Sequence, residues 1–276
     1  QPPAEHVHAD LRRHRDRVPL QSRRRGRWIT VLGGFLIVIA VGNLLRNAVT
    51  YTDQGHIDVA IDGNRVVISD SGKGIPQQEV NDIFITHLHV DHYHDLSYLL
   101  PFRAWSGGWV PLRVHGPSGR TPELGVQGMV NGMKQMLKWH LEAFDMFPIG
   151  DGYEVEVNEY DWKDENGICY DKNGVTVRHW RRSHAKDGAT GYRLDWNGLS
   201  FVFGGDSAPN KWFIERAKGA DFVIHEMFYT PKGLEEALGF PPRQATIVSS
   251  YIHTPPSGFG KIMAEVNPRL AVAYHT

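Results

Sequence analysis

The 276-residue sequence contains a single cysteine, Cys169. One thiol excludes a disulfide bond within the chain, although it leaves the redox compartment undecided. Cys169 lies in a polar stretch, residues 166–174, without a ligand pattern around it. The sequence therefore offers no support for a covalent cysteine mechanism, and no serine pattern supports one either.

The net charge is also small, −1 at pH 7. The charge is unevenly placed: residues 1–27 hold eight arginines against three acidic residues, a net +5, so the other 249 residues carry −6. An acidic body is a poor partner for a polyanion unless a local patch overrides the average. With 41% hydrophobic residues, the composition is typical of one globular domain with ample core.

Long uncharged stretches are few, and residues 28–45 form one that is eighteen residues long. Four arginines within residues 23–27 precede it and Arg46 follows it. This length is near the lower limit for a membrane span, and the basic flank would keep the tail cytoplasmic and the domain outside. Two interpretations stay open: a membrane anchor, or buried strands in a cytoplasmic protein.

Three histidines and one aspartate are packed into residues 86–92, Thr-His-Leu-His-Val-Asp-His. The apolar residues before them predict a strand over 83–86, and alternation along it places His87 and His89 on the same side. Asp91 and His92 fall where the chain turns into a helix. Four ligand-type residues at this spacing indicate a site for two metal ions rather than surface histidines.

Three more ligand-type residues lie downstream at the ends of apolar runs that read as strands. They are His184 after residues 175–180, Asp206 after residues 199–205 and His275 after residues 270–274. Asn197-Gly198 predicts a tight hairpin turn, so the strands on either side of it should be antiparallel neighbours. This pairing favours the convergence of His184 and Asp206, and Gly204-Gly205 allows a sharp bend before the aspartate.

With these motifs the chain resembles the metallo-β-lactamase superfamily from about Asp58 to its last residue. The resemblance implies an α/β (α+β) fold, a four-layer αβ/βα sandwich, with two zinc ions in the cleft between its sheets. It implies these ligands: His87, His89 and His184 for the first zinc, Asp91, His92 and His275 for the second, and Asp206 as the bridge. Asp91 would also orient the attacking hydroxide. Iron or manganese would suit the same ligand set.

Two later segments resemble the paired His-Glu and His-Thr motifs of the tRNase Z-like branch. They are residues 220–226, which end in His225-Glu226, and residues 253–256, which begin with His253-Thr254. The resemblance implies that Glu226 orients His253 and that His253 protonates the leaving oxygen as a general acid. An ordinary buried polar pair is the alternative for these two residues, and His225 is expected to pack at a strand end.

The expected activity is hydrolysis by a metal-bound hydroxide, acting on a phosphodiester in a tRNase Z-like enzyme. Opening of a β-lactam or lactone is the alternative substrate, and a zinc-binding fragment without turnover is the alternative of another class. tRNA itself is disfavoured, because the 22 positions between His184 and Asp206 leave room for a hairpin but not for the family's tRNA-clasping arm. The resemblance also suggests a homodimer.

Residues 103–173 are expected to shape specificity. Apolar residues at helical spacing predict an amphipathic helix near residues 128–144 whose apolar face packs in the core: Met129, Met133, Met136, Leu137, Leu141 and Phe144. The loop from Trp105 to Trp109 is the expected pocket wall. The expected domains are a basic, disordered tail at 1–27, the apolar segment at 28–45 and a catalytic domain at 46–276, with opening strands at 48–52, 56–61 and 65–70.

Overall fold

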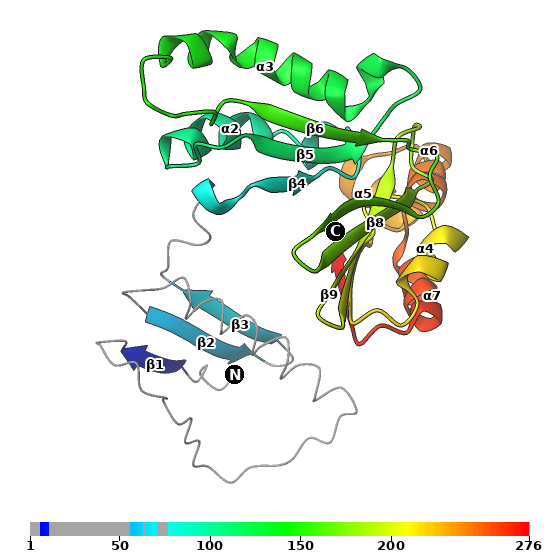
Figure 1. Cartoon of the computed structure of the whole chain (residues 1–276). Helices are drawn as coiled ribbons and strands as arrows, with labels where there is room; N and C mark the ends of the chain where they lie inside the picture. The colour runs from blue at the N-terminus through cyan, green and yellow to red at the C-terminus, as the bar shows by residue number, and fades with distance from the viewer. Residues whose placement is uncertain (1–5, 11–55, 63–64, 71–76, 276) are drawn as a thin grey trace. The chain divides into compact units, whose positions relative to one another are not determined.

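The computed structural model of the chain describes residues 6–10, 56–62, 65–70 and 77–275. The chain divides into two compact units, residues 1–76 and residues 77–276 (Figure 1). The apolar segment at 28–45 and the strand expected at 48–52 lie outside the described residues. Within the described ranges, no helix is both long and apolar enough to cross a membrane.

The first unit forms its own three-stranded antiparallel sheet in the order β1-β2-β3. Its strands are β1 (His6–Asp10), β2 (His56–Asp62) and β3 (Arg65–Asp70). The last two fall where the sequence predicts strands. β1 lies inside the basic tail expected at residues 1–27.

The second unit is built on two sheets with helices outside each (Figure 1). The smaller sheet is parallel, in the order β4-β5-β6: β4 (Asp82–Phe84), β5 (Leu112–Pro117) and β6 (Val155–Tyr160). The larger has the order β12-β11-β10-β9-β8-β7. Its strands are β7 (Gly167–Lys172), β8 (Val175–Arg181), β9 (Thr190–Trp196), β10 (Leu199–Phe203), β11 (Phe222–Glu226) and β12 (Leu270–Tyr274).

Helices connect these strands. The α-helices are α2 (Leu96–Trp105), α3 (Val126–Ala143), α4 (Lys211–Ala217), α5 (Pro231–Leu238), α6 (Pro242–Ile247) and α7 (Pro256–Val266). Short 3-10 turns are η1 (Gln77–Glu79), η2 (Val90–His92) and η3 (Pro122–Leu124), and a π-helical turn is η4 (Val248–Ile252). The predicted helix near residues 128–144 is confirmed as α3.

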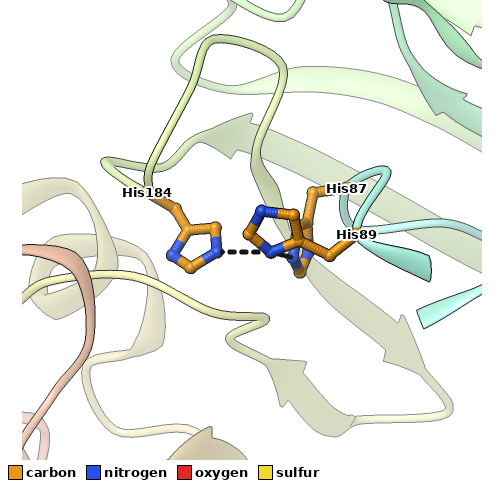
Figure 2. Close-up of side chains that lie close together, drawn as sticks. All are labelled: His87, His89 and His184. Carbon is orange, nitrogen blue, oxygen red and sulfur yellow. Dashed lines mark hydrogen bonds between the residues drawn. The ribbon is translucent and has the colours of Figure 1, made fainter. Parts of the chain in front are cut away.

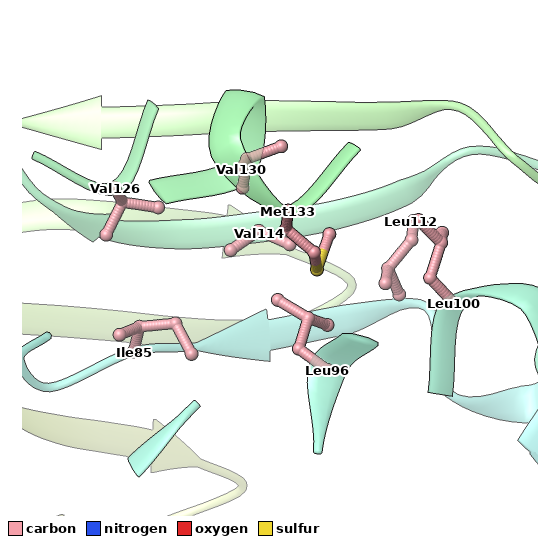
Figure 3. Close-up of a cluster of buried hydrophobic side chains, with 8 residues drawn as sticks. All are labelled: Ile85, Leu96, Leu100, Leu112, Val114, Val126, Val130 and Met133. Carbon is pink, nitrogen blue, oxygen red and sulfur yellow. The ribbon is translucent and has the colours of Figure 1, made fainter. Parts of the chain in front are cut away.

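Alternation along β4 divides the core into two faces. Ile83 and Ile85 face a cluster shared with α2 and α3, which includes Leu100, Leu112 and Val130 (Figure 3). Phe84, between them, instead packs against the larger sheet among Tyr170, Tyr192 and their neighbours. Apolar faces of α2 and α3 therefore cover one side of the small sheet, and the large sheet covers the other.

The outer face of the large sheet is covered by α4 and α7. Phe213 and Ala217 of α4 and Ile262 and Val266 of α7 join one buried cluster with Trp180 and other strand residues. Helices, sheet, sheet and helices thus form four layers. The predicted αβ/βα sandwich is confirmed.

Strand direction explains where the predicted site residues gather. The Asn197-Gly198 turn has φ values of 50° and 76°, and it joins β9 and β10 into the predicted antiparallel hairpin. Because β9 is antiparallel to both β8 and β10, these two run in the same direction, and β11 and β12 continue parallel to β10. The carboxyl ends of β8, β10, β11 and β12 therefore meet at one edge of the sheet.

Candidate metal centre

The loop that follows β4 is fixed to both sheets before it reaches its first histidine. The Ile85 N–H donates to the His115 carbonyl at 2.8 Å, and the Tyr192 hydroxyl donates to the Ile85 carbonyl at 2.6 Å. The Thr190 N–H donates to the Thr86 carbonyl at 2.9 Å. The strand ends at Phe84, two residues earlier than predicted, and these bonds hold the loop beyond it.

Three imidazoles converge on one point beyond this loop (Figure 2). The Nδ1 atom of His89 lies 3.1 Å from Nε2 of His87 and 3.1 Å from Nε2 of His184. The Thr86 hydroxyl contacts Nδ1 of His87, and Nδ1 of His184 donates to the Ile252 carbonyl at 3.1 Å. In His87 and His184, Nδ1 is therefore engaged, which leaves Nε2 of each ring free to point to the place where the three imidazoles meet.

Burial keeps two of these rings neutral. Desolvation, together with the neighbouring imidazoles of His92 and His184, lowers the pKa of His87 to about 3. Desolvation lowers the pKa of His184 to about 4. Both rings are uncharged at pH 7, which is the state in which imidazole binds a metal cation.

A second group of donors lies beside the first. Nε2 of His92 is 3.2 Å from Asp91 Oδ2 and 3.3 Å from Asp206 Oδ2. Nε2 of His275 is 3.5 Å from Asp91 Oδ2 and 3.3 Å from Asp206 Oδ2. Asp206 Oδ2 therefore lies between the two histidines, and His92 and Asp206 also form a three-residue group with His87 of the first cluster.

Asp206 is held by its other oxygen. The Tyr274 hydroxyl donates to Oδ1 at 2.8 Å, and the aspartate is 1% exposed. Gly205, directly before it, has φ 61°, and a Cβ there would approach the Thr190 carbonyl to 3.0 Å. Although burial favours the neutral carboxyl, the close contact with the His92 imidazole and the charges of His275 and His92 hold the pKa of Asp206 well below its usual range.

Two of these donor atoms lack hydrogen bonds, as atoms that bind a metal ion would. Asp206 Oδ2 and His92 Nε2 are buried and have no hydrogen-bond partner. Buried polar atoms of folded proteins are nearly always satisfied, so each such atom calls for an explanation. A cation between them would coordinate both atoms. Family membership and this donor set together support divalent metal binding at the centre.

Glu226 and His253 form the pair that the sequence predicts. Nδ1 of His253 donates to Glu226 Oε2 at 2.6 Å, and the Ser207 N–H donates to the other oxygen, Oε1. Glu226 is fully buried, and this desolvation raises its pKa. Phe228 stacks on His253 with ring centroids 4.2 Å apart. Orientation of the imidazole is therefore fixed by a carboxylate on one edge and an aromatic ring on one face.

His225 packs at the end of β11, as expected. Its Nδ1 donates to the Glu226 carbonyl at 2.8 Å, and its Nε2 accepts from Arg182 at 2.9 Å. Burial and the Arg182 charge lower the pKa of His225 to about 3. Arg182 is itself buried and lies above the Phe213 ring. Both ring nitrogens of His225 are therefore in hydrogen bonds, one of them with the Arg182 guanidinium, and neither is left to bind a metal.

A pocket of about 640 Å³ opens beside the first histidine cluster. Its walls are the histidine loop, the loop after His184 and one face of α3 with Met129, Met133 and Met136. The loop from Trp105 to Trp109 is the expected pocket wall, but neither tryptophan lines this pocket. Trp105 instead stacks on His140 of α3 at 5.2 Å and donates to the Tyr153 hydroxyl at 2.7 Å.

Residues 71–276, about three quarters of the chain, match the family model described as a beta-lactamase superfamily domain. The chain belongs to this superfamily. A second model, described as histidine kinase-, DNA gyrase B-, and HSP90-like ATPase, matches residues 35–96, a range that overlaps the first. It covers less than half of the chain.

Curated relatives bear on the branch of the superfamily. A ribonuclease Z of Mycobacterium avium (strain 104) is 29% identical over 177 residues, which cover 59% of this chain and 60% of the relative. A ribonuclease Z of Mycobacterium sp. (strain KMS) is 30% identical over 176 residues, with 62% and 58% covered. The chain thus spans about 60% of the length of the curated relatives it matches.

Human tRNase Z, short form, has a similar fold, with a TM-score of 0.52 at 16% identity over 80% of this chain and 86% of that one. The predicted superfamily and fold are confirmed, and the ribonuclease Z relatives support the predicted tRNase Z-like branch. Membership in this superfamily indicates a hydrolase.

Sequence reasoning missed three features of the centre. Tyr274, which fixes Asp206, could have been suspected because it precedes His275 at a strand end. Tyr192 could not, because its partner Ile85 is 107 positions away. The methionine face of α3, for which the helical pattern favours core packing, also lines the pocket.

Proposed function

We propose that this chain is a hydrolase that holds two divalent cations and cleaves a phosphodiester. One observation carries the proposal: Asp206 Oδ2 lies at the meeting point of two groups of donors, buried and without a hydrogen bond. These residues would hold the first cation: His87, His89 and His184. These would hold the second: Asp91, His92 and His275. Asp206 would contact both, and the ligand types favour zinc.

When bound, two cations of this kind supply hydroxide at neutral pH and neutralise charge on the scissile group. The chain's own residues do the rest. Asp91, whose side chain is 59% exposed, would orient the attacking water from the cleft side. Tyr274 keeps Asp206 in place through its other oxygen.

His253 would give the proton to the leaving oxygen. Its Nδ1 is engaged by Glu226, so Nε2 is the atom left to donate. A neighbouring carboxylate stabilises the protonated imidazole and fixes its direction, which is the arrangement that general acid catalysis requires. Since protonation matters most for an alkoxide leaving group, this pair favours phosphodiester cleavage over β-lactam opening.

A short ligand fits this site better than a folded tRNA. Between His184 and Asp206 the described chain contains a short loop and the β9–β10 hairpin, without the tRNA-clasping arm of the family. The relatives' name, ribonuclease Z, supports a phosphodiester as the bond that is cut. A homodimer and an anchor at residues 28–45 remain predictions.

Metal analysis combined with turnover tests this proposal. The purified chain should contain two zinc ions and hydrolyse bis(p-nitrophenyl) phosphate faster than a chromogenic cephalosporin, and chelation should abolish both activities. Faster cephalosporin hydrolysis would select the lactamase alternative. Bound metal without turnover of either substrate would select the inactive zinc-binding alternative.

A further inference from the structure

The pocket beside the first histidine cluster has a wall that the proposed hydrolysis does not use. Three methionines of α3, Met129, Met133 and Met136, line it at helical spacing. Its volume of about 640 Å³ is within the range of small-molecule sites. The pocket includes His87, His89 and His184 but neither His253 nor His275. It therefore lies on the side of the centre away from the proposed proton donor.

A glycine, Gly132, leaves a narrow gap in this wall, which we call the slot. Gly132 lies on the same face of α3, and a Cβ added there would meet nothing within 4 Å. A glycine in the middle of a helix costs about 0.5–1 kcal/mol relative to alanine, so its presence here calls for a reason. The open space at Gly132, flanked by thioether side chains, provides one, because a flat group can enter where a side chain would stand.

The chemistry of the lining selects the kind of group. Thioethers adapt their shape and make favourable contacts with aromatic rings. Asp187 of the lining accepts from the Arg120 N–H at 2.9 Å and forms an ion pair with the Lys186 ammonium at 4.0 Å. The Lys186 side chain is 66% exposed and can turn to a phosphate oxygen at the rim, two positions beyond His184.

We infer that this pocket binds one planar aromatic arm, such as a nucleobase, of a phosphodiester whose other arm leaves on the His253 side. The inference rests on the proposed function for the scissile bond. It adds the substrate class: a small diester with a flat ring on the retained arm, stacked against the α3 methionines. Met136, 67% exposed, stands at the mouth, and Met133, 7% exposed, at the base.

Two diesters with the same leaving group test whether the pocket binds an aromatic arm. They are the p-nitrophenyl phosphodiester of thymidine and the same compound without the base. With the zinc-loaded chain, we expect kcat/KM to be about tenfold higher for the thymidine diester, as two or three ring–thioether contacts would give. A ratio near one would overturn the inference, as would an equal gain from a hexyl arm in place of the nucleoside.

Matched variants locate the arm. Gly132→Phe fills the slot, and the ratio should fall to near one while the metal content stays unchanged. Gly260→Phe is the control, because Gly260 lies in helix α7 with equally open space around it, outside the pocket. Gly260→Phe should keep the tenfold ratio. A ratio that persists in Gly132→Phe would place the ring elsewhere.

A binding measurement separates this inference from the proposed function. With methionine methyl groups labelled with ¹³C, the thymidine diester should shift the signals of Met129, Met133 and Met136 in the chelator-treated chain. The signals of Met146 and Met263 should not move, and Met263, packed in the core, also reports that the fold is kept. Shifts without chelator-sensitive turnover would refute the hydrolase and retain the pocket. Turnover without these shifts would refute the pocket alone.

Discussion

Replacing His253 by alanine probes the proposed proton relay. Glu226 is fully buried, and its two oxygens accept from His253 and from the Ser207 N–H. The imidazole therefore has one fixed orientation, and removing it deletes a single, well-placed donor. General acid catalysis contributes roughly 10²–10⁴-fold to rate. We expect His253→Ala to lose activity within that range on substrates that need a proton on the leaving oxygen.

The loss should depend on the leaving group. p-Nitrophenolate is stable without protonation, whereas phenolate leaves more slowly and gains more from a proton. Initial rates with bis(p-nitrophenyl) phosphate and diphenyl phosphate should therefore fall unequally in His253→Ala, with the larger loss for diphenyl phosphate. Tyr251→Ala, two positions earlier and 72% exposed, is the control and should change neither rate.

The metal content of His253→Ala shows whether the variant has lost only its proton donor or also its metal centre. Removal of His253 leaves Glu226 buried without its partner, and since burial already raises the pKa of Glu226, the carboxyl should take up a proton rather than remain charged. The metal ligands are not altered. Equal losses on both substrates with full metal content would refute the relay, and hydrolysis of a cephalosporin should be nearly unaffected.

Three further changes test the centre. Asp206→Asn should reduce the metal content from two ions to one or fewer after dialysis, because it weakens the oxygen shared by both groups; two retained ions would contradict the bridge. Tyr192→Phe removes the bond to the β4 loop and should lower the free energy of unfolding by about 1 kcal/mol in urea, with weaker zinc binding; unchanged values for both would exclude this anchoring. The metal-free chain should lose stability between pH 6.5 and pH 4. His87 and His184 accept protons there only when unfolded, each adding up to about 1.4 kcal/mol per pH unit. The raised pKa of His92 acts above pH 6.5, where it favours the folded state as the pH falls, and does not change the slope below. A higher urea midpoint in acid would contradict this sign.

Local patterns predicted the strands and the ligand-bearing turns well. Residues 86–92 carry their ligands within seven positions, and apolar runs mark β8, β10 and β12 directly. Strand direction then follows from one Asn-Gly hairpin turn. These features depend on neighbours in sequence, so the sequence alone could place them.

Features that depend on distant contacts were not predictable. A 3.6-residue period cannot distinguish a helix face in the core from one that lines a pocket, and α3 does both with Met133. The stacking of Trp105 on His140 was not predictable either, since it joins elements far apart in sequence. Likewise, no local signal links Tyr192 to the Ile85 carbonyl.

Anomalous diffraction at the zinc absorption edge, on crystals of the zinc-loaded chain, would locate the cations directly. Two peaks are expected, with Asp206 between them. One should be bounded by His87, His89 and His184, and the other by Asp91, His92 and His275. One peak alone, or a pair of peaks that leaves Asp206 outside both coordination shells, would contradict the two-metal centre.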